Sequence, residues 1–282
     1  MIAALAALLL IGPPGVQAAE TADSIMARVA ENQDRAQQMR TAFVFNQNVL
    51  VRLNRTNGKL AREEVSDFIV TPTADGVRRE QTSFSGKLVE GKKTIEFSES
   101  GWEHKNLDID AAIAHGFAED FGSDNHNKDG IAHDLFPLRG AEQRKYIFKL
   151  EGSEEYRGFP VYRITFEPRT KHSVIDDDGD KGSWAGEVLV HRAEFQPVLI
   201  TTRLAAKIPL WVKTALGTDV QQLGFKITYQ KFDEGLWFPV NYGGEFKVRA
   251  LFLYARKIGI SVRNSDFQRA AVDSKVSFAT VQ

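Results

Sequence analysis

Histidines and aspartates gather in one part of the chain, where together they suggest metal or acid–base chemistry. Four of the six histidines fall between residues 101 and 144. They and nearby aspartates are His104, His115, His126, His133, Asp124, Asp129 and Asp134. A zinc site needs three or four convergent ligands, often at short spacing. The intervals here are long and neither HExxH nor HxH occurs, so we interpret these residues as surface groups and predict no metal site.

Two stretches resemble ligand-binding loops but fail at defining positions. Gly86–Lys93 nearly matches a phosphate-binding P-loop, but its last residue is lysine where the motif requires Ser or Thr, and no helix is expected to follow. A hairpin turn is the better interpretation. Asp176–Asp180 resembles a calcium loop, yet placing Gly179 at the sixth position puts Val174 and Ala185 at the first and twelfth. A solvated acidic loop is favoured there.

Nucleophilic catalysis has no sequence motif to support it. The segment GSWAG places Trp184 where a GxSxG motif needs serine. The chain has no cysteine, which excludes disulfides, thiolate nucleophiles and zinc–thiolate sites. We predict no catalytic residue and no cofactor. A hydrolase that uses the histidines and aspartates of residues 101–144 remains a third functional alternative.

The composition indicates a globular protein without a nucleic-acid partner. The 282 residues are 43% hydrophobic and 26% charged, which argues against disorder. A net charge of −1 lacks the basic excess that broad nucleic-acid binding requires.

The N-terminus has the features of an export signal. Ile2–Ile11 contains only Ala, Leu and Ile, and the helix-breaking segment Gly12–Gly15 follows it. The apolar run is about half of the roughly 20 residues that a membrane-spanning helix needs. No lysine or arginine precedes it, so the positively charged part of the signal is atypical or truncated. We predict a signal peptide over 1–19 and a soluble periplasmic domain over 20–282.

The hydrophobic pattern predicts an α+β fold that is mostly antiparallel β. A helix is expected over about 22–40, capped by Asp23 or Ser24. Its apolar stripe is Ile25, Val29, Ala36 and Met39. Alternating apolar and polar residues predict strands from residue 43 onward, and most clearly over 183–267, which is typical of a sheet with one buried and one solvated face. A helical insertion is expected at about 101–144, with helices over 108–121 and 131–136, covering one end of the sheet.

An apolar cluster interrupts the later strands. Ile208-Pro209-Leu210-Trp211-Val212 lies between two strands and is flanked by Lys207 and Lys213. It is either part of the core or an apolar rim at the mouth of a cavity, with the lysines facing lipid headgroups or a partner.

Three phrases resemble the LolA/LolB-like superfamily of periplasmic lipoprotein and lipid carriers. They are Trp184-x-Gly186-Glu187 at the start of a strand, the turn Phe195-x-Pro197, and the hairpin ITYQKFDEGLWFPVNYGGEF. The resemblance implies a curved, incomplete barrel wrapped around the N-terminal helix and the helical insertion, with an apolar interior that accepts acyl chains. It implies no catalytic residues.

From this resemblance we expect a non-catalytic carrier or binding protein for lipoprotein acyl chains or another lipid-like ligand. The residues expected to line the ligand site are Phe43, Phe45, Val49, Val51, Phe68, Val70, Ile208, Leu210 and Trp211. Burial of this face against the helices is the alternative interpretation. The competing function is an envelope scaffolding protein that binds a protein partner, and peripheral membrane contact is compatible with either function.

Overall fold

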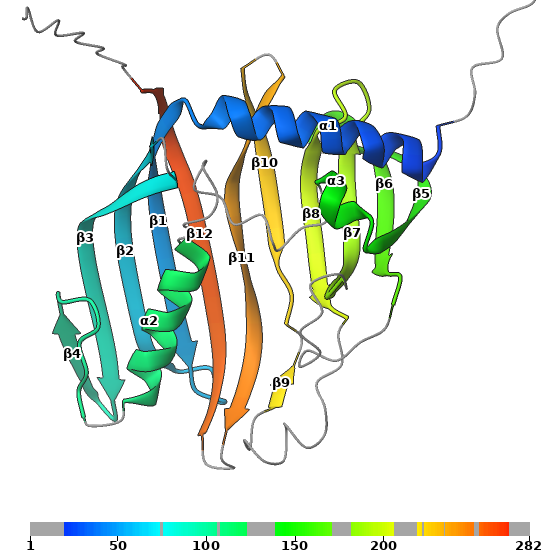
Figure 1. Ribbon diagram of the computed structural model, residues 1–282. Coiled ribbons are helices and arrows are strands. Elements are labelled where there is room, and N and C mark those ends of the chain that lie inside the picture. The colour runs from blue at the N-terminus through cyan, green and yellow to red at the C-terminus, as the bar shows by residue number, and fades with distance from the viewer. Residues whose placement is uncertain are drawn as a thin grey trace, which may run out of the picture.

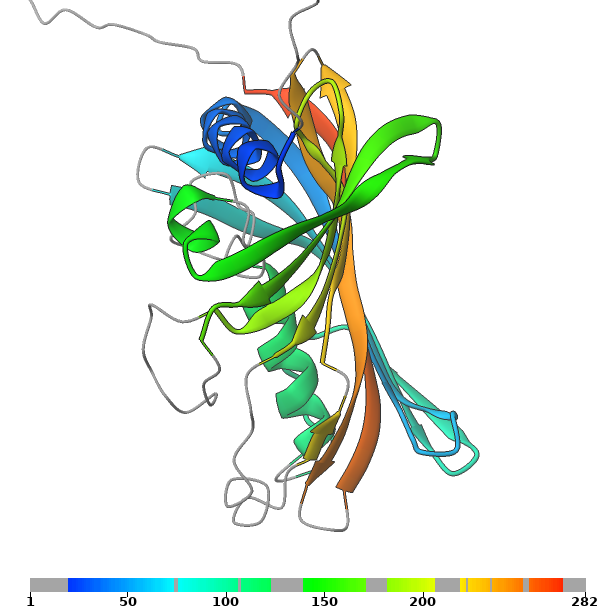
Figure 2. The ribbon, with the colours of Figure 1, turned by 90° about the vertical axis from the view of Figure 1, so that its right-hand side faces the viewer.

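One antiparallel sheet, with every helix against the same face, makes up the described part of the chain (Figures 1 and 2). The computed structural model describes residues 20–73, 76–105, 108–122, 139–170, 182–205, 219–221, 223–233, 235–250 and 254–270. The helices are α1 (Ala22–Arg40), α2 (Ile109–Gly122) and α3 (Gly140–Gln143). The strands are β1 (Phe43–Asn54), β2 (Leu60–Thr73), β3 (Gly76–Glu90), β4 (Lys93–Phe97), β5 (Tyr146–Tyr156), β6 (Phe159–Pro168), β7 (Trp184–His191), β8 (Pro197–Leu204), β9 (Asp219–Gln221), β10 (Lys226–Asp233), β11 (Leu236–Ala250) and β12 (Tyr254–Arg269).

The order of the strands leaves the sheet open. It runs β4-β3-β2-β1-β12-β11-β10-β8-β7-β6-β5, with β9 beside β11. Within the described residues β4 and β5 form the two edges and do not pair, so the curved sheet does not close. The predicted class is therefore confirmed: α+β, mostly antiparallel, a curved and incomplete barrel with helices on its concave side.

Strand β1 shows why this sheet has one dry face. Alternate residues point to opposite faces of a strand, so one set is buried together. The buried set is Phe43, Phe45, Gln47, Val49, Val51 and Leu53. In the ladder with β2, Phe45 faces Val70 and Gln47 faces Phe68, which continues the set onto the neighbouring strand.

Helix α1 forms as predicted, but its first turn differs from the prediction. Thr21 is the N-cap and forms a capping box with Ser24, so neither Asp23 nor Ser24 is the cap. Ile25 and Val29 are fully buried, as expected from the apolar stripe. The prediction was wrong for Met39, which is 37% exposed, whereas Arg40 in the same turn is buried.

The turns at one end of the sheet hold α1 in place. Asn32 donates to the carbonyl oxygens of Glu194 and Phe195, at 2.8 and 3.2 Å. Buried Gln33 donates to Gln196 at 2.7 Å, and the Arg28 guanidinium lies 4.4 Å from the centre of the Phe195 ring. The Phe195-x-Pro197 phrase is therefore a helix-binding turn.

The insertion contributes a helix to the concave face. Helix α2, predicted over 108–121, spans Ile109–Gly122 and contacts β1, β2 and β12. Ile109 is 43% exposed, whereas Ala111 and Ala114 are buried. The predicted helix over 131–136 and the acidic loop at 176–180 lie outside the described residues. The interpretation of Gly86–Lys93 as hairpin structure is confirmed, because the β3–β4 turn falls within it.

Candidate functional site: the concave face of the sheet

The concave face carries one continuous apolar cluster that extends from α1 to α2. It combines residues of α1, α2 and most strands, among them Met26, Ala114 and Ile227. Such a face can be a closed core or the wall of a site for an apolar ligand, depending on how far the protein's own side chains cover it.

Most of the predicted ligand residues on β1 and β2 are buried in the structure. Five of them are only 1–3% exposed: Phe43, Phe45, Val49, Val51 and Val70. Phe68 is half-buried, with the Arg79 guanidinium 3.4 Å from its ring centre. The buried five can touch a ligand only if covering elements move. Ile208, Leu210 and Trp211 lie outside the described residues.

These predicted residues do not form one group. Val49 and Val51 belong to the main cluster, against which Phe68 packs. Phe43 belongs to a second cluster with Leu236 and Phe238. The Phe45 ring contacts Phe267, at 5.4 Å between centroids.

Other apolar residues on the concave face are covered less completely, and sequence reasoning did not select them. They pack against the main cluster yet remain half-buried: Ile113, Phe148, Leu150, Trp184 and Leu223. In the β5–β6 ladder Phe148 faces buried Phe166 and Leu150 faces buried Ile164, which sets both on the concave side. Only the alternation along β5 could have identified them from sequence.

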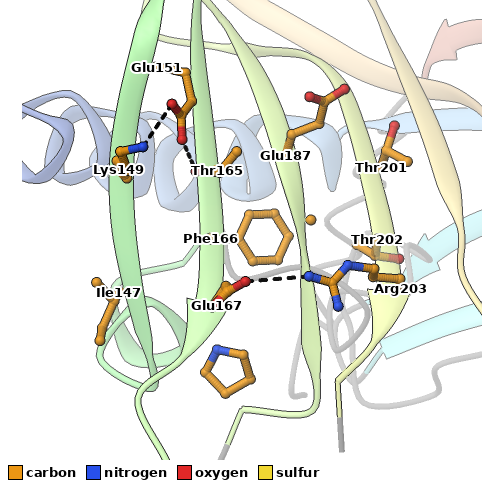
Figure 3. A pocket seen from close by; sticks show the side chains of 12 residues that line it. Ile147, Lys149, Glu151, Thr165, Phe166, Glu167, Glu187, Thr201, Thr202 and Arg203 are labelled. Atoms are coloured by element: carbon orange, nitrogen blue, oxygen red, sulfur yellow. Dashed lines mark hydrogen bonds and ion pairs between the residues drawn. The ribbon is translucent and has the colours of Figure 1, made fainter.

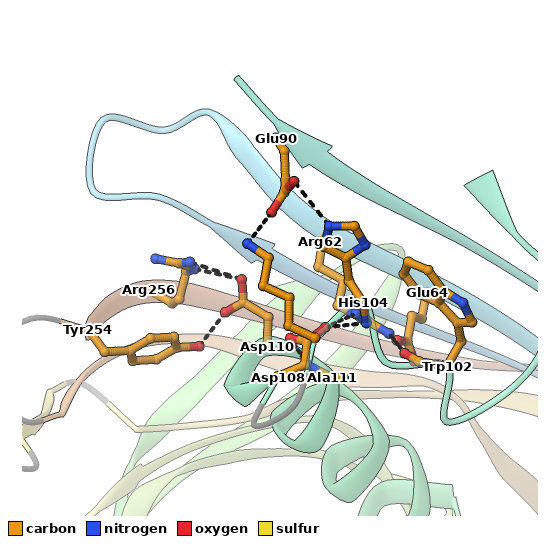
Figure 4. Close-up of polar contacts among 11 residues, drawn as sticks. Arg62, Glu64, Glu90, Trp102, His104, Asp108, Asp110, Ala111, Tyr254 and Arg256 are labelled. Carbon is orange, nitrogen blue, oxygen red and sulfur yellow. Dashed lines mark hydrogen bonds and ion pairs between the residues drawn. The ribbon is translucent and has the colours of Figure 1, made fainter. Parts of the chain in front are cut away.

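A buried polar network joins α2 to the sheet (Figure 4). Arg62, which has no exposed surface, donates to Glu64 at 2.5 Å, to Asp108 at 3.1 Å and to the Trp102 carbonyl oxygen at 2.5 Å. Asp108 also accepts from the backbone N–H of Ala111 and thus caps α2. Burial raises the pKa of Glu64, and the hydrogen bond and charge of Arg62 offset this only in part.

A second polar contact fixes the same helix end. Asp110 accepts from the Tyr254 hydroxyl at 2.6 Å and pairs with Arg256 at 2.9 Å (Figure 4). Burial and the Asp110 carboxylate raise the pKa of Tyr254, so this phenol is neutral and acts as a donor.

The histidines of the insertion do not converge in the described structure. His104 pairs with Glu90 at 3.2 Å, whereas His115 lies on the exposed side of α2. His126 and His133 fall outside the described residues. Within the described ranges, no three His, Asp or Glu side chains are grouped as metal ligands would be.

The convex face has its own hollow, of about 700 Å³ (Figure 3). It lies across β5–β8 on the side of the sheet away from α1. Four of its five charged groups pair with each other, Lys149 with Glu151 at 3.0 Å and Arg203 with Glu167 at 3.4 Å, and the fifth, Glu187, pairs with Arg163 outside the lining. Because these four ions already neutralise one another, the hollow offers little to a charged ligand.

Comparisons with known proteins give distant similarities only. No family model and no curated protein matches the chain. A DUF1329 family protein from Desulfovibrio piger is 10% identical, with a TM-score of 0.37, over 92% of this chain and 96% of that chain. A LolA superfamily protein from Nitrosomonas europaea is 13% identical, with a TM-score of 0.33, over 92% and 97%.

The lipoprotein LppX of Mycobacterium tuberculosis is similar as well, at 10% identity and a TM-score of 0.24, over 89% of this chain and 99% of that chain. Because identities and TM-scores are this low, function has to be inferred from the residues of this chain. No helix in the described ranges is both long and apolar enough to span a membrane.

Proposed function

We propose that this protein is an exported, non-catalytic carrier that binds a lipid-like apolar ligand on the concave face of its sheet. The observation that carries this proposal is the group of half-buried apolar side chains, including Phe148, Leu150 and Trp184, on a face whose remaining residues are core. Acyl chains bind by burial of apolar surface, at roughly 0.8 kcal/mol per buried CH₂ group. The export signal that the sequence predicts over 1–19 supports a periplasmic location.

Helix α2 is the element that we expect to move when the ligand enters. Among its described apolar side chains, only the small Ala111 and Ala114 are fully buried, and Ile109 is 43% exposed. Ile113 and Ala118 also pack against the main cluster, so among the described side chains the attachment combines this modest apolar contact with the polar contacts of Asp108 and Asp110. Displacement of α2 would uncover Val49, Val51 and Phe68, three of the residues that the sequence selected.

A pair of neighbouring residues on β5 tests the proposed site. Phe148 is on the concave face, whereas Ile147 is 54% exposed on the convex face. The measurement is titration of delipidated protein with a dansyl-labelled fatty acid, followed by fluorescence. Phe148→Asp should weaken binding at least about tenfold, because it puts a charge beside the acyl chain. Phe148→Leu and Ile147→Asp should bind as the unmodified protein does.

Chemical unfolding of each variant separates lost binding from lost structure. Equal weakening by Phe148→Asp and Ile147→Asp, with both proteins folded, would reject the concave face as the site. No binding of the probe by unmodified protein, together with no lipid in mass spectra of protein extracted from its native compartment, would reject the carrier function.

A protein partner is the second candidate function, and the free edge of β5 favours it. Within the described residues β5 pairs only with β6, so one side of an 11-residue strand keeps its backbone hydrogen-bonding groups unpaired. Such an edge can accept a strand from another protein. Recovery of a stable protein complex, with no bound lipid, would favour this function over the carrier.

A further inference from the structure

A basic hollow of about 270 Å³ lies at the end of the sheet opposite α1. It is formed where the β1–β2 turn bends away from the ends of β11 and β12, a divergence visible in Figure 2. Five basic residues contribute to its lining and no acidic residue does: Arg55, Lys247, Arg249, Arg256 and Lys257. Thr56 adds a hydroxyl group to the wall.

The nearby acidic groups do not balance these cations. Arg256 pairs with Asp110, and Lys257 with Glu245 at 2.7 Å. Arg256 and Asp110 neutralise each other on the concave side; on the convex side the three cations Lys247, Arg249 and Lys257 have one described carboxylate, Glu245, which leaves an excess of two positive charges.

The register of the β11–β12 ladder makes this excess unfavourable without a ligand. Lys247 and Lys257 are directly opposite each other, and like charges at opposed positions destabilise a sheet. Phe246 is buried and Val248 packs against the core, so Lys247 and Arg249 point to the convex face, where both are exposed. Among the described residues neither forms an ion pair or a side-chain hydrogen bond.

We propose that this hollow binds a phosphate-type anion, either the headgroup of a lipid or a free phosphate ester. A phosphate monoester carries about −1.5 to −2 charges near neutral pH, which matches the excess of positive charge. The guanidinium of Arg249 can donate two parallel hydrogen bonds to phosphate oxygens, and the lysines supply point charges. The site is separate from the half-buried apolar side chains of β5 and β7 and does not depend on the carrier function.

Two matched double variants test this site. Lys247→Gln/Arg249→Gln removes the two cations that form no ion pair among the described residues. Lys149→Gln/Arg203→Gln removes two exposed cations of β5 and β8, elsewhere on the convex face. Both variants change the net charge equally. Binding is measured by calorimetry with glycerol 3-phosphate and by sedimentation with vesicles of phosphatidylglycerol and phosphatidylcholine. We expect the first variant to weaken binding about thirtyfold, since each cation near an anionic surface contributes roughly fivefold, and the second to retain binding.

The two probes separate the two sources of the anion. Loss of glycerol 3-phosphate binding in the first variant alone supports the site and assigns it to a free phosphate ester if vesicles do not bind. Loss of vesicle binding in that variant alone supports a lipid headgroup. Absence of binding to both probes, or equal loss in the two double variants, overturns the proposal. Phe148→Asp should leave the binding of both probes unchanged, so a failure of the carrier function can be distinguished from a failure of this site.

Discussion

Helices α1 and α2 lie on the same concave face but attach to it by different physical means. Helix α1 buries large apolar side chains, since Ile25, Met26 and Val29 are at most 1% exposed. Among the described apolar side chains of helix α2, only the small Ala111 and Ala114 are fully buried, and ion pairs join the helix to the sheet. The burial of large side chains contributes roughly 1.5–3 kcal/mol each, whereas a buried ion pair has little net value once desolvation is counted.

This difference assigns separate roles to the end of the sheet that α1 covers and the end that α2 covers. Removing α1 would expose apolar surface to water, so it behaves as part of the core. Among its described side chains, α2 contacts the main cluster through Ile113, Ala114 and Ala118, a smaller apolar contact than that of α1, and water can solvate the separated ions. The α2 end is therefore the one suited to opening, and each of the following experiments is aimed at this contrast.

The largest effect is expected from the arginine under α2. Arg62→Met should lower the free energy of unfolding by about 3–5 kcal/mol, because it leaves Glu64 and Asp108 buried without their partner. Arg52→Met is the control: Arg52 pairs with Glu63 on the convex face, is 49% exposed, and should cost less than about 1 kcal/mol. Urea unfolding measures both. Similar losses for the two variants would mean that Arg62 has water or another partner available.

Truncation of an isoleucine on each helix compares the two apolar contacts directly. Ile25→Ala on α1 should cost about 3 kcal/mol, because Ile25 has no exposed surface. Ile109→Ala on α2 should change stability by less than about 0.5 kcal/mol, because that side chain is 43% exposed. The same urea titration is sufficient. A larger loss at Ile109 than at Ile25 would reverse the roles proposed for the helices.

The Asp110 contact tests whether α2 can be released selectively. Asp110→Asn should cost about 1–3 kcal/mol, because it removes the charge that pairs with Arg256 and weakens the bond from Tyr254. Hydrogen exchange of backbone amides should accelerate in α2 and stay unchanged in α1. Equal acceleration in both helices would show that they open as one unit.

The smallest effect concerns pH at the α1 end. Burial alone would raise the pKa of Glu194, but hydrogen bonds from Lys231 and Trp237 outweigh it and lower the pKa below its ordinary value of 4.5. The unfolded chain then binds this proton more readily, so the contribution is present above pH 4.5 and is lost as the pH falls through the lowered pKa.

Glu194→Gln should therefore cost roughly 1 kcal/mol at neutral pH, and less as the pH falls below 4. Unfolding at several pH values measures this trend. A difference between unmodified protein and variant that grows as the pH falls would contradict the sign of the shift.

Local sequence patterns were sufficient to predict the helices and strands. The stripe of Ile25 and Val29 predicts α1, and the alternation that starts at Phe43 predicts β1 and its buried face, because these periods follow directly from helix and strand geometry. The phrase around Phe195 marks a real turn, and its described contacts include those with α1.

Local sequence patterns were insufficient to predict which residues form the candidate site. Ile147 and Phe148 are adjacent apolar residues, and the pairing of β5 with β6 decides which of them faces the concavity. Arg62 reads as a surface residue in an alternating strand, yet it is fully buried because Asp108, far along the chain, comes to lie beside it.

The sequence by itself determined the fold class, the dry face of the sheet and the positions of α1 and α2, since each depends on contacts within a few residues. Only the tertiary structure decided which apolar residues stay half-buried, which ions hold α2, and that Lys247 and Lys257 oppose each other. The reason is physical: burial and charge balance depend on neighbours that the fold brings together from distant parts of the chain.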